Sequence, residues 1–598
     1  MYILGISGQY RDAAAALIRD GQIIAALEEE KLARIKHIGI GQCGGLPYEG
    51  IRFCLETAGI GIEDVDYVTY YFEPWSSLRR QLHFNVKRAR YSPTSTIHQS
   101  IASINELHER LRTQALIKRL LGDSSKVVDM DHQLAHAASS FYLSGFDRAA
   151  ILVLSGVGDF VTIATGVGEG ADIRLLDRIQ FPTSLGWVYS LVTEYLGFRP
   201  NQEEHKTQWL SVTGEPEFLA TFSDMIRLDQ KGIPGINLSY FAPSLGGPDP
   251  FSEEFYRRFG DSLRCKDQRF KNGKNGSSLR DPIEGVNGPS AKAEQTASRY
   301  RQNVASSLQR RLEEVVLALA ENLRLRLRAD CLCLAGGVSL NSLLVSRLER
   351  DSGYQHVFVP PAAGNTGCSL GGALHLWHAQ LGGRPTGPLR HVFIGPEYSD
   401  QQIKPVLDNC KLAYRYFTTE EKLLAEIVEL LHQGRIVAWF QGRAEFGPRS
   451  LGARSILASP LHDYMKENLN LFVKHREDFR PFAASVPEER AVEFFEHHSP
   501  LSQFLLSVSR IRDEKRSLIP AAWFSDGLAR VHTVSRKTNP LFWRLLNAFG
   551  AKTGVPVLLN TSFNLFGDPI VCTPREAVRS FYCSGIDALV INRFLLQK

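Results

Sequence analysis

The sequence has little that suits a membrane, secreted or strongly charged protein. No uninterrupted apolar run reaches the roughly 20 residues that a transmembrane helix needs. The N-terminus has no basic region followed by an apolar core, so it does not resemble a signal peptide. The formal net charge is only +5 over 598 residues, which argues against a nucleic-acid or membrane partner bound by bulk electrostatics. We expect a cytoplasmic protein with neither partner.

Cysteine is also scarce. Of nine cysteines, only Cys331 and Cys333 are closely spaced, and they lie in an apolar, strand-like run. Buried reduced thiols therefore explain the cysteines better than disulfides or a zinc site. The rest of the composition is that of a globular protein, with 43% hydrophobic and 22% charged residues. Because 598 residues exceed what one hydrophobic core usually organises, we expect two or more domains.

A strand–turn–strand pattern is present twice. Within the first 30 residues, the apolar strands YILGIS and QIIAALEE are joined through a glycine-bounded turn and an alanine-rich stretch. The layout recurs over residues 149–170, where ILVLS enters a turn at Gly156–Gly158 and VTIATGVG leaves it. Glycine lets a backbone approach a phosphate closely. Paired hairpins of this kind are typical of a duplicated, actin/hexokinase-like ATPase domain of the α/β class.

Later segments place glycines where strands open into helices. An apolar strand leads into Gly336 and Gly337, and Asn341 follows within the same turn region. Such a turn suits close packing against a nucleoside, and the N-terminus of the next helix favours anions. Residues 359–374 repeat the arrangement with a Pro/Gly loop that opens another helix.

Changes in texture divide the chain. Residues 229–296 are rich in Gly, Pro, Ser and charges, which predicts an irregular excursion from the first domain. Residues 381–396 predict a linker, after which a helix and a strand are expected over residues 420–442. We predict a first domain over residues 1–385 and a second α/β domain over residues 390–598, whose end packs back on the first.

The segment from Gln441 to Arg480 carries the clearest functional signal. Its cations are interleaved with glycines and braced by apolar residues; they are Arg443, Arg449, Arg454, Lys474, Arg476 and Arg480. Arginine offers two-pronged contacts to phosphate oxygens, and lysine acts as a point charge. The segment therefore indicates a site for a buried polyanion such as a nucleotide triphosphate or an acyl phosphate. The alternative is a surface salt-bridge network that uses Glu445, Glu477 and Asp478.

These motifs carry a family resemblance. QGRAEFGPRSLGARSIL, VKHREDFRPFA, TGVPVLLNTSFNLFGDPIVCTP and the N-terminal DAAAALIRDGQIIAALEEEKLARIKH are similar to the O-carbamoyltransferases of antibiotic tailoring and nodulation-factor synthesis. The resemblance implies a YrdC-like C-terminal domain that forms carbamoyl adenylate from ATP, with Mg²⁺, and carbamoyl phosphate. It also implies an N-terminal domain, similar to the tRNA threonylcarbamoyl transferases, that moves the carbamoyl group to a small-molecule acceptor.

The resemblance implies roles for single residues. Arg449 and Lys474 match a phosphate-gripping catalytic pair, and Arg11 and Asp12 occupy the transfer site. The candidate cofactor-binding residues are Arg443, Arg454, Arg476, Arg480, Arg530, Asn560, Ser562, Asn564, Gly336, Gly337, Asn341, Lys206 and Asn365. His132 and His136 stand four apart on a helix, so they share one face and match two ligands of an Fe²⁺ or other divalent metal.

The chain departs from the family pattern in its N-terminal part. Ser155 and Asn365 replace the two aspartate ligands of the metal, and Asp159 lies four residues from the first of these positions. Arg11 replaces a histidine that serves carbamoyl transfer, and arginine stays protonated, so it is no general base. Trp209 is expected to reshape the acceptor side.

Three hypotheses follow. The first is ATP-dependent carbamoyl transfer to a hydroxyl or amine of a secondary-metabolite intermediate. The second is a repurposed enzyme that phosphorylates or adenylates its substrate for ligation, cyclisation or dehydration. The third is a nucleotide-binding subunit without catalysis. The density of cations around Arg449 and Lys474 favours an enzyme over the third.

Overall fold

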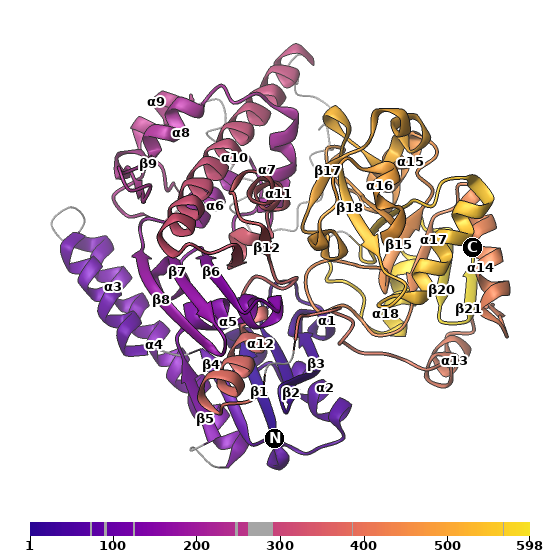
Figure 1. Ribbon diagram of the computed structural model, residues 1–598, viewed down its shortest axis with the longest axis horizontal. Coiled ribbons are helices and arrows are strands. Elements are labelled where there is room, and N and C mark those ends of the chain that lie inside the picture. The colour runs from indigo at the N-terminus through magenta and orange to yellow at the C-terminus, as the bar shows by residue number, and fades with distance from the viewer. Residues whose placement is uncertain are drawn as a thin grey trace, which may run out of the picture.

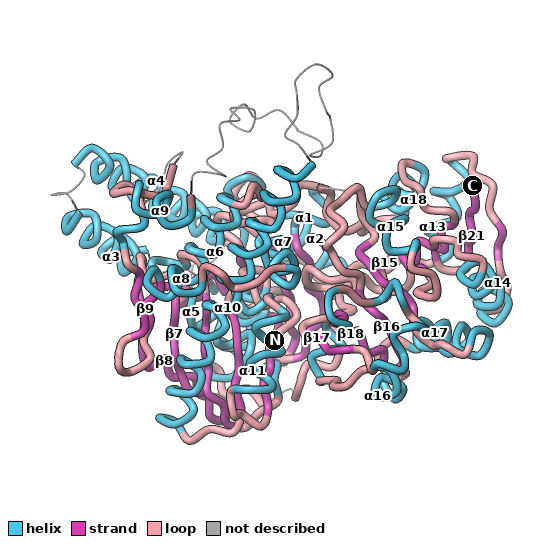
Figure 2. The backbone as a smooth tube through the Cα atoms, turned by 90° about the horizontal axis from the view of Figure 1, so that it is seen from above, coloured by secondary structure: helices cyan, strands magenta, loops and turns pink. Residues whose placement is uncertain are grey.

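A computed structural model describes residues 1–71, 74–88, 93–122, 126–245, 249–260, 291–384, 387–565 and 567–598. Two regions lie side by side, the first running from indigo to pink and the second from orange to yellow (Figure 1). Seen from above, α3 (Pro74–Arg88) lies near one end of the molecule and α14 (Glu420–His432) near the other (Figure 2). Among the described residues, no helix combines the length and apolarity needed to cross a membrane.

The first region contains a five-stranded sheet built on the N-terminal hairpins. Its order is β3-β2-β1-β4-β5, with β1, β2 and β3 antiparallel and with β4 and β5 added in parallel to β1. The strands are β1 (Tyr2–Ser7), β2 (Ala14–Arg19), β3 (Gln22–Glu28), β4 (Tyr67–Tyr71) and β5 (Val127–Met130). The alanine-rich stretch expected as a connection is itself β2, because its small side chains let α2 (Tyr48–Ala58) and α12 (Gly367–His375) approach the sheet closely.

A second five-stranded sheet repeats this topology. Its order is β12-β11-β6-β7-β8, with an antiparallel β6-β7-β8 meander and with β11 and β12 parallel to β6. The strands are β6 (Arg148–Leu154), β7 (Val161–Glu169), β8 (Asp172–Gln180), β11 (Cys331–Ala335) and β12 (His356–Phe358). Helix α5 (His132–Ser144) packs on this sheet and against α12, which packs on the first. The duplicated actin/hexokinase-like fold is confirmed.

The second region is built on a mixed nine-stranded sheet. Its order is β13-β21-β20-β14-β15-β19-β16-β18-β17. The strands are β13 (Arg415–Tyr416), β14 (Val437–Phe440), β15 (Arg454–Ala458), β16 (Ala483–Pro487), β17 (Val508–Arg510), β18 (Leu528–Val534), β19 (Leu558–Ser562), β20 (Ala588–Ile591) and β21 (Phe594–Gln597). Apolar positions of α14 and α17 (Pro540–Thr553) pack on one face, and α13 (Asp400–Asn409) and α18 (Pro574–Tyr582) join the core on the other. The predicted second α/β unit is present.

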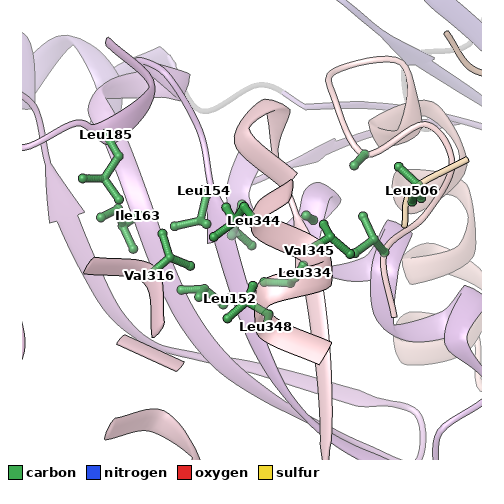
Figure 3. Close-up of a cluster of buried hydrophobic side chains, with 14 of the residues drawn as sticks. Leu152, Leu154, Ile163, Leu185, Val316, Leu334, Leu344, Val345, Leu348 and Leu506 are labelled. Carbon is green, nitrogen blue, oxygen red and sulfur yellow. The ribbon is translucent and has the colours of Figure 1, made fainter. Parts of the chain in front are cut away.

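The two regions share buried apolar surface. Leu506, from the second region, lies beside Val345 of α11 (Ser342–Asp351) in the core cluster of the first (Figure 3). Near the chain's end, Arg34 donates to the carbonyl oxygens of Pro569 at 3.0 Å and Ile570 at 2.9 Å. The domain limits at residues 385 and 390 stay a prediction, because one core cluster spans both regions.

The expected irregular excursion is partly regular. Phe255 and Phe259 on α9 (Glu253–Phe259) are buried against the first region, so this part belongs to its core. Residues 261–290 of the excursion lie outside the described residues. The remaining elements are α1 (Glu29–Ala33), α4 (Pro93–Leu121), α6 (Leu185–Tyr195), α7 (Glu204–Leu210), α8 (Leu219–Met225), β9 (Ile226–Leu228), β10 (Pro234–Ile236), α10 (Ala291–Leu327), α15 (Tyr464–Asn468) and α16 (Ala491–Phe494).

Candidate functional site

A cluster of cations lies where the two regions meet. We define this cation cluster as Arg449, Lys474, Arg476, Arg480 and Arg530, the last from β18. Burial and then the charge of Arg480 lower the pKa of Arg449 to about 10. Burial and then Arg449 lower the pKa of Arg530 well below its usual value. Because arginine keeps its proton in proteins, these shifts indicate positive charge that a bound anion would stabilise.

Lys474 is held in place by the polar turn at the end of β19. Its Nζ donates to the carbonyl oxygens of Ser562 and Asn564, both at 2.8 Å, and to Oδ1 of Asn564 at 2.6 Å. Ser562 Oγ donates to the same Oδ1 at 2.7 Å. Asn560 is buried deeper, and its Nδ2 lies 3.4 Å from the carbonyl oxygen of Ser450. The structure therefore brings Ser562 and Asn564 to Lys474 as orienting groups.

Two predicted cations have other partners. Arg443 donates to the carbonyl oxygens of Gly395 at 3.0 Å, Ile394 at 2.6 Å and Ile24 at 3.1 Å, which ties the linker to β3. Arg454 is fully buried, stacks 3.6 Å from the ring centroid of Phe440 and donates to four backbone carbonyls. These guanidinium groups hold the loop around the cation cluster in shape, whereas the cluster itself has an excess of positive charge.

The first region contributes further cations. Lys206 on α7 lies 2.7 Å from Oε1 of Glu477 and 2.8 Å from Oε1 of Glu203. Burial and then the charges of Arg480 and Lys36 lower the pKa of the neighbouring His205 well below its usual value. Lys206 thus pairs with Glu203 and Glu477, the carboxylates nearest to Arg480. The cation cluster therefore keeps an excess of positive charge.

The surface salt-bridge alternative is only partly present. Glu477 pairs with Lys206 at 2.7 Å and lies 3.9 Å from Arg480. Glu445 is buried and accepts from the backbone amides of Leu451 at 2.7 Å and Ala453 at 2.8 Å. This carboxylate therefore holds the glycine-rich loop in shape, and it forms no part of a surface network.

The predicted nucleoside loop contacts the cation cluster. Gly336 has φ of 90°, and a Cβ atom there would lie 2.2 Å from the carbonyl oxygen of Leu154, so only glycine fits. Asn341 caps α11 by accepting from the amide of Leu344 at 3.1 Å, and Nη2 of Arg449 lies 3.4 Å from the carbonyl oxygen of Leu340. A Cβ atom at the adjacent Gly337 would meet nothing within 4 Å. The loop and Arg449 border the same space.

The predicted metal pair has a third neighbour that the sequence reasoning missed. The rings of His132 and His136 lie 4.8 Å apart, and Cys368 of α12 joins them in a buried group whose ligand atoms all lie within 4.8 Å of one another. Nδ1 of each histidine is buried without a hydrogen-bond partner in the described part of the chain. Unpartnered buried imidazole nitrogens beside a thiol fit a transition metal.

Both replaced ligand positions adjoin this group. A Cβ atom at Gly158 would lie 3.3 Å from Cβ of Ser155 and 3.4 Å from Cε1 of His132. Burial lowers the pKa of His132, and the side chain of Asn365 acts in the opposite direction. Asp159 Oδ2 lies 3.7 Å from Nδ1 of His132, but its ion pair is with Arg110. The group therefore offers two imidazoles and a thiol, and neither Ser155 nor Asn365 adds a carboxylate to it.

Arg11 and Asp12 lie in the turn between β1 and β2. Nε of Arg11 is 2.9 Å from Oδ2 of Asp12, and Nδ1 of His37 is 2.7 Å from Oδ1. Burial would raise the pKa of Asp12, but the hydrogen bond from His37 and the charge of Arg11 lower it overall. His37 was missed by the sequence reasoning, because its contact with Asp12 spans 25 residues and no spacing rule indicates it.

Comparisons with known proteins agree with this architecture. Family models described as carbamoyltransferase N-terminus and carbamoyltransferase C-terminus match residues 2–374 and 428–598. Nodulation protein NolNO of Sinorhizobium fredii is 34% identical over 98% of this chain and 79% of its own length. Nodulation protein NolO of Bradyrhizobium diazoefficiens is 34% identical over 78% of this chain and 79% of its own. The crystal structure of HypF from T. kodakarensis covers 64% of this chain and 48% of its own at 14% identity, with a TM-score of 0.30, which is too low to bear on function.

Proposed function

The chain belongs to the carbamoyltransferase family, and we propose that it forms carbamoyl adenylate from ATP and carbamoyl phosphate and then transfers the carbamoyl group to a hydroxyl or amine of a natural-product intermediate. The observation that carries the proposal is the cation cluster. Lys474 is buried among cations, and the charges that lower its pKa further are Arg476, Arg480 and Lys36. Such a site is stabilised by polyanionic reactants.

The first half-reaction needs this charge. Carbamoyl phosphate is hydrolysed to carbamate and phosphate, and the carbamate oxygen then attacks the α-phosphorus of ATP. The bond to the bridging oxygen breaks, and pyrophosphate leaves with the electron pair. Both reactants are anionic, so fixed cations such as Arg449 and Lys474 lower the repulsion and stabilise charge that grows on the leaving group. The Mg²⁺ of the nucleotide would add to this effect.

A transition metal fits beside the transfer site. His132, His136 and Cys368 would hold it, since their ligand atoms converge and an imidazole nitrogen of each histidine lacks a partner. A bound metal would act there as a Lewis acid toward a carbonyl oxygen. The thiol makes this donor set softer than one with carboxylates, so zinc or another thiophilic metal suits it better than Mg²⁺.

One assay tests the proposal. The purified chain is incubated with ATP and carbamoyl phosphate, and pyrophosphate release is followed. We expect release that depends on carbamoyl phosphate and falls about 10²-fold or more in Lys474→Ala, because one preorganised charge is lost. Lys422→Ala, on the exposed side of α14, is the matched control and should leave the rate unchanged. Absence of carbamoyl-phosphate-dependent release would contradict the proposal.

A second candidate, ATP-dependent phosphorylation of a substrate, is favoured by one observation. Ser155 and Asn365 remove two carboxylates from the transfer site, and Arg11 removes a base. Phosphorylation would give ADP and no pyrophosphate. Nucleotide analysis by chromatography in the same assay therefore separates the two, since AMP and pyrophosphate accompany only adenylate formation.

A further inference from the structure

Asp12 and His37 form a hydrogen-bonded pair between the β1–β2 turn and the segment that follows α1. The imidazole Nδ1 lies 2.7 Å from Oδ1 of Asp12 and 3.1 Å from Nη2 of Arg11. In a neutral ring, the shorter contact with the carboxylate assigns the proton to Nδ1 and leaves a lone pair on Nε2. That Nε2 is buried and has no hydrogen-bond partner among the described residues.

An imidazole oriented through Nδ1 by a carboxylate, with Nε2 free, is the arrangement of a general base. We propose that His37, oriented by Asp12, takes the proton of the acceptor hydroxyl in the transfer step. The inference rests on the proposed function, and it supplies the base that Arg11 cannot be. His37 is then a catalytic residue, and Asp12 is a positioning residue.

The backbone holds this pair in a sparsely populated conformation. Asp12 and His37 both have φ of 58°, in the left-handed region. A Cβ atom at Gly39 would lie 2.3 Å from the backbone of Tyr10, so the segment after His37 packs directly on the β1–β2 turn. Ala13 donates its amide to the carbonyl oxygen of Ile38 at 2.9 Å. Conformations of this kind persist where the surroundings fix them, and they concentrate at functional sites.

The pair borders the cation cluster. Lys36 immediately precedes His37, and the charges of Arg480 and Lys206 lower its pKa after the larger effect of burial. Arg11 donates from Nη1 to the carbonyl oxygen of Asn201, in the loop that leads to Lys206. A nucleotide-bound carbamoyl group held by the cation cluster would therefore have His37 on its first-region side.

The transfer step balances with one base. The acceptor oxygen forms a bond to the carbamoyl carbon while its proton passes to Nε2 of His37. The bond from the carbamoyl carbon to the oxygen of AMP breaks, and AMP leaves with the electron pair. The products are the carbamate ester, AMP and one proton, which His37 then releases to solvent.

His37→Asn is the sharpest variant. Asparagine tolerates the left-handed backbone, and its amide keeps a donor for Asp12, but it has no basic nitrogen. The probe acceptors are methanol, which needs a base, and hydroxylamine, which is nucleophilic as a neutral amine and traps acyl adenylates without one. We expect His37→Asn to lose about 10²- to 10⁴-fold in methyl carbamate formation and to keep hydroxyurea formation within about twofold. His108→Asn, whose side chain is 77% exposed, is the control.

The outcomes separate the two proposals. Equal methyl carbamate rates in wild type and His37→Asn would overturn the role of His37. Absence of hydroxyurea formation by the wild-type protein would overturn the proposal that it forms carbamoyl adenylate. A metal lost in His37→Asn but kept in His136→Ala would also overturn it, because Asp12, Glu30 and His37 lie close enough to share an ion.

Two readouts exclude a merely structural role. The wild-type methyl carbamate rate should rise with pH as one group loses its proton, whereas the profile of His37→Asn should be flat. The other charged groups beside the ring are Asp12, Arg11 and Glu30. Independently of any acceptor, ¹⁵N shifts of ring-labelled histidine should show that the neutral ring of His37 carries its proton on Nδ1 and none on Nε2. A proton on Nε2 would overturn the proposal even if methanol is a poor acceptor.

Discussion

The two halves of the first region each place an aspartate in the equivalent turn, close to a histidine but in different surroundings. In the β1–β2 turn, Asp12 has φ of 58° and lies 2.7 Å from Nδ1 of His37. In the β6–β7 turn, Asp159 has φ of 53° and lies 3.7 Å from Nδ1 of His132. The duplicated turn therefore carries an aspartate in both halves, whereas the neighbouring histidine comes from a different element each time, His37 after α1 and His132 on α5.

Burial separates the two turns. The Asp12 side chain is 23% exposed and its partner Arg11 is 31% exposed, whereas Asp159 and Arg110 are 6% and 4% exposed. The first carboxylate can orient a base that meets substrate. The carboxylate of Asp159 instead forms a buried ion pair with Arg110, next to the histidines that fit a metal. The position in the fold therefore does not by itself set the role of the aspartate; its access to solvent does.

The largest loss of stability is expected when the ion pair in the buried β6–β7 turn is removed. Arg110→Met leaves the carboxylate of Asp159 without its cation in a dry site, and we expect a loss of about 3–5 kcal/mol in the free energy of unfolding. Arg11→Met, in the exposed turn, should cost about 1 kcal/mol or less. Urea denaturation measures both. Adding Asp159→Asn to Arg110→Met should recover much of the loss, and similar losses for the two arginine variants would contradict the comparison.

A smaller effect tests how tightly each turn is packed. Gly39→Ala would place Cβ 2.3 Å from backbone atoms of Tyr10, which cannot move away, so we expect a loss of about 1–3 kcal/mol in the free energy of unfolding. Gly158→Ala would meet only side chains, the nearest being Nε2 of Gln133 at 2.9 Å, and should cost about 1 kcal/mol or less. Thermal denaturation of the pair checks the order, and a reversed order would show that the second turn is the stiffer one.

Much of this architecture could be predicted from sequence patterns, because glycine turns between apolar strands are local signals. The strand β2 could not, since alanine has low strand propensity and its burial depends on helices that arrive later in the chain. It could likewise be predicted that a cluster of cations exists in the second region, but not which of its arginines belong to the cluster. Arg443 contacts Ile24 across 419 residues, and no local pattern shows that its donors are used by carbonyl oxygens. Cys368 stands near His132 only through the packing of α12 on α5.

The smallest expected effect is the change in the stability of Asp12→Asn, relative to wild type, as the pH falls. In the folded chain the pKa of Asp12 lies below its usual 3.8, despite burial, because of His37 and Arg11. A carboxylate with a lowered pKa contributes stability above the unfolded-state value and loses it as pH falls through the folded-state value. Asp12→Asn should therefore be less stable than wild type at pH 7 by about 1 kcal/mol, and the difference should shrink as the pH drops below about 4. Denaturation at pH 7 and pH 3 measures this, with the exposed Asp147→Asn as the control. A difference in stability that stays constant with pH would mean that Asp12 contributes through packing and not through its charge. The exposed β1–β2 turn would then resemble the buried β6–β7 turn more than its exposure suggests.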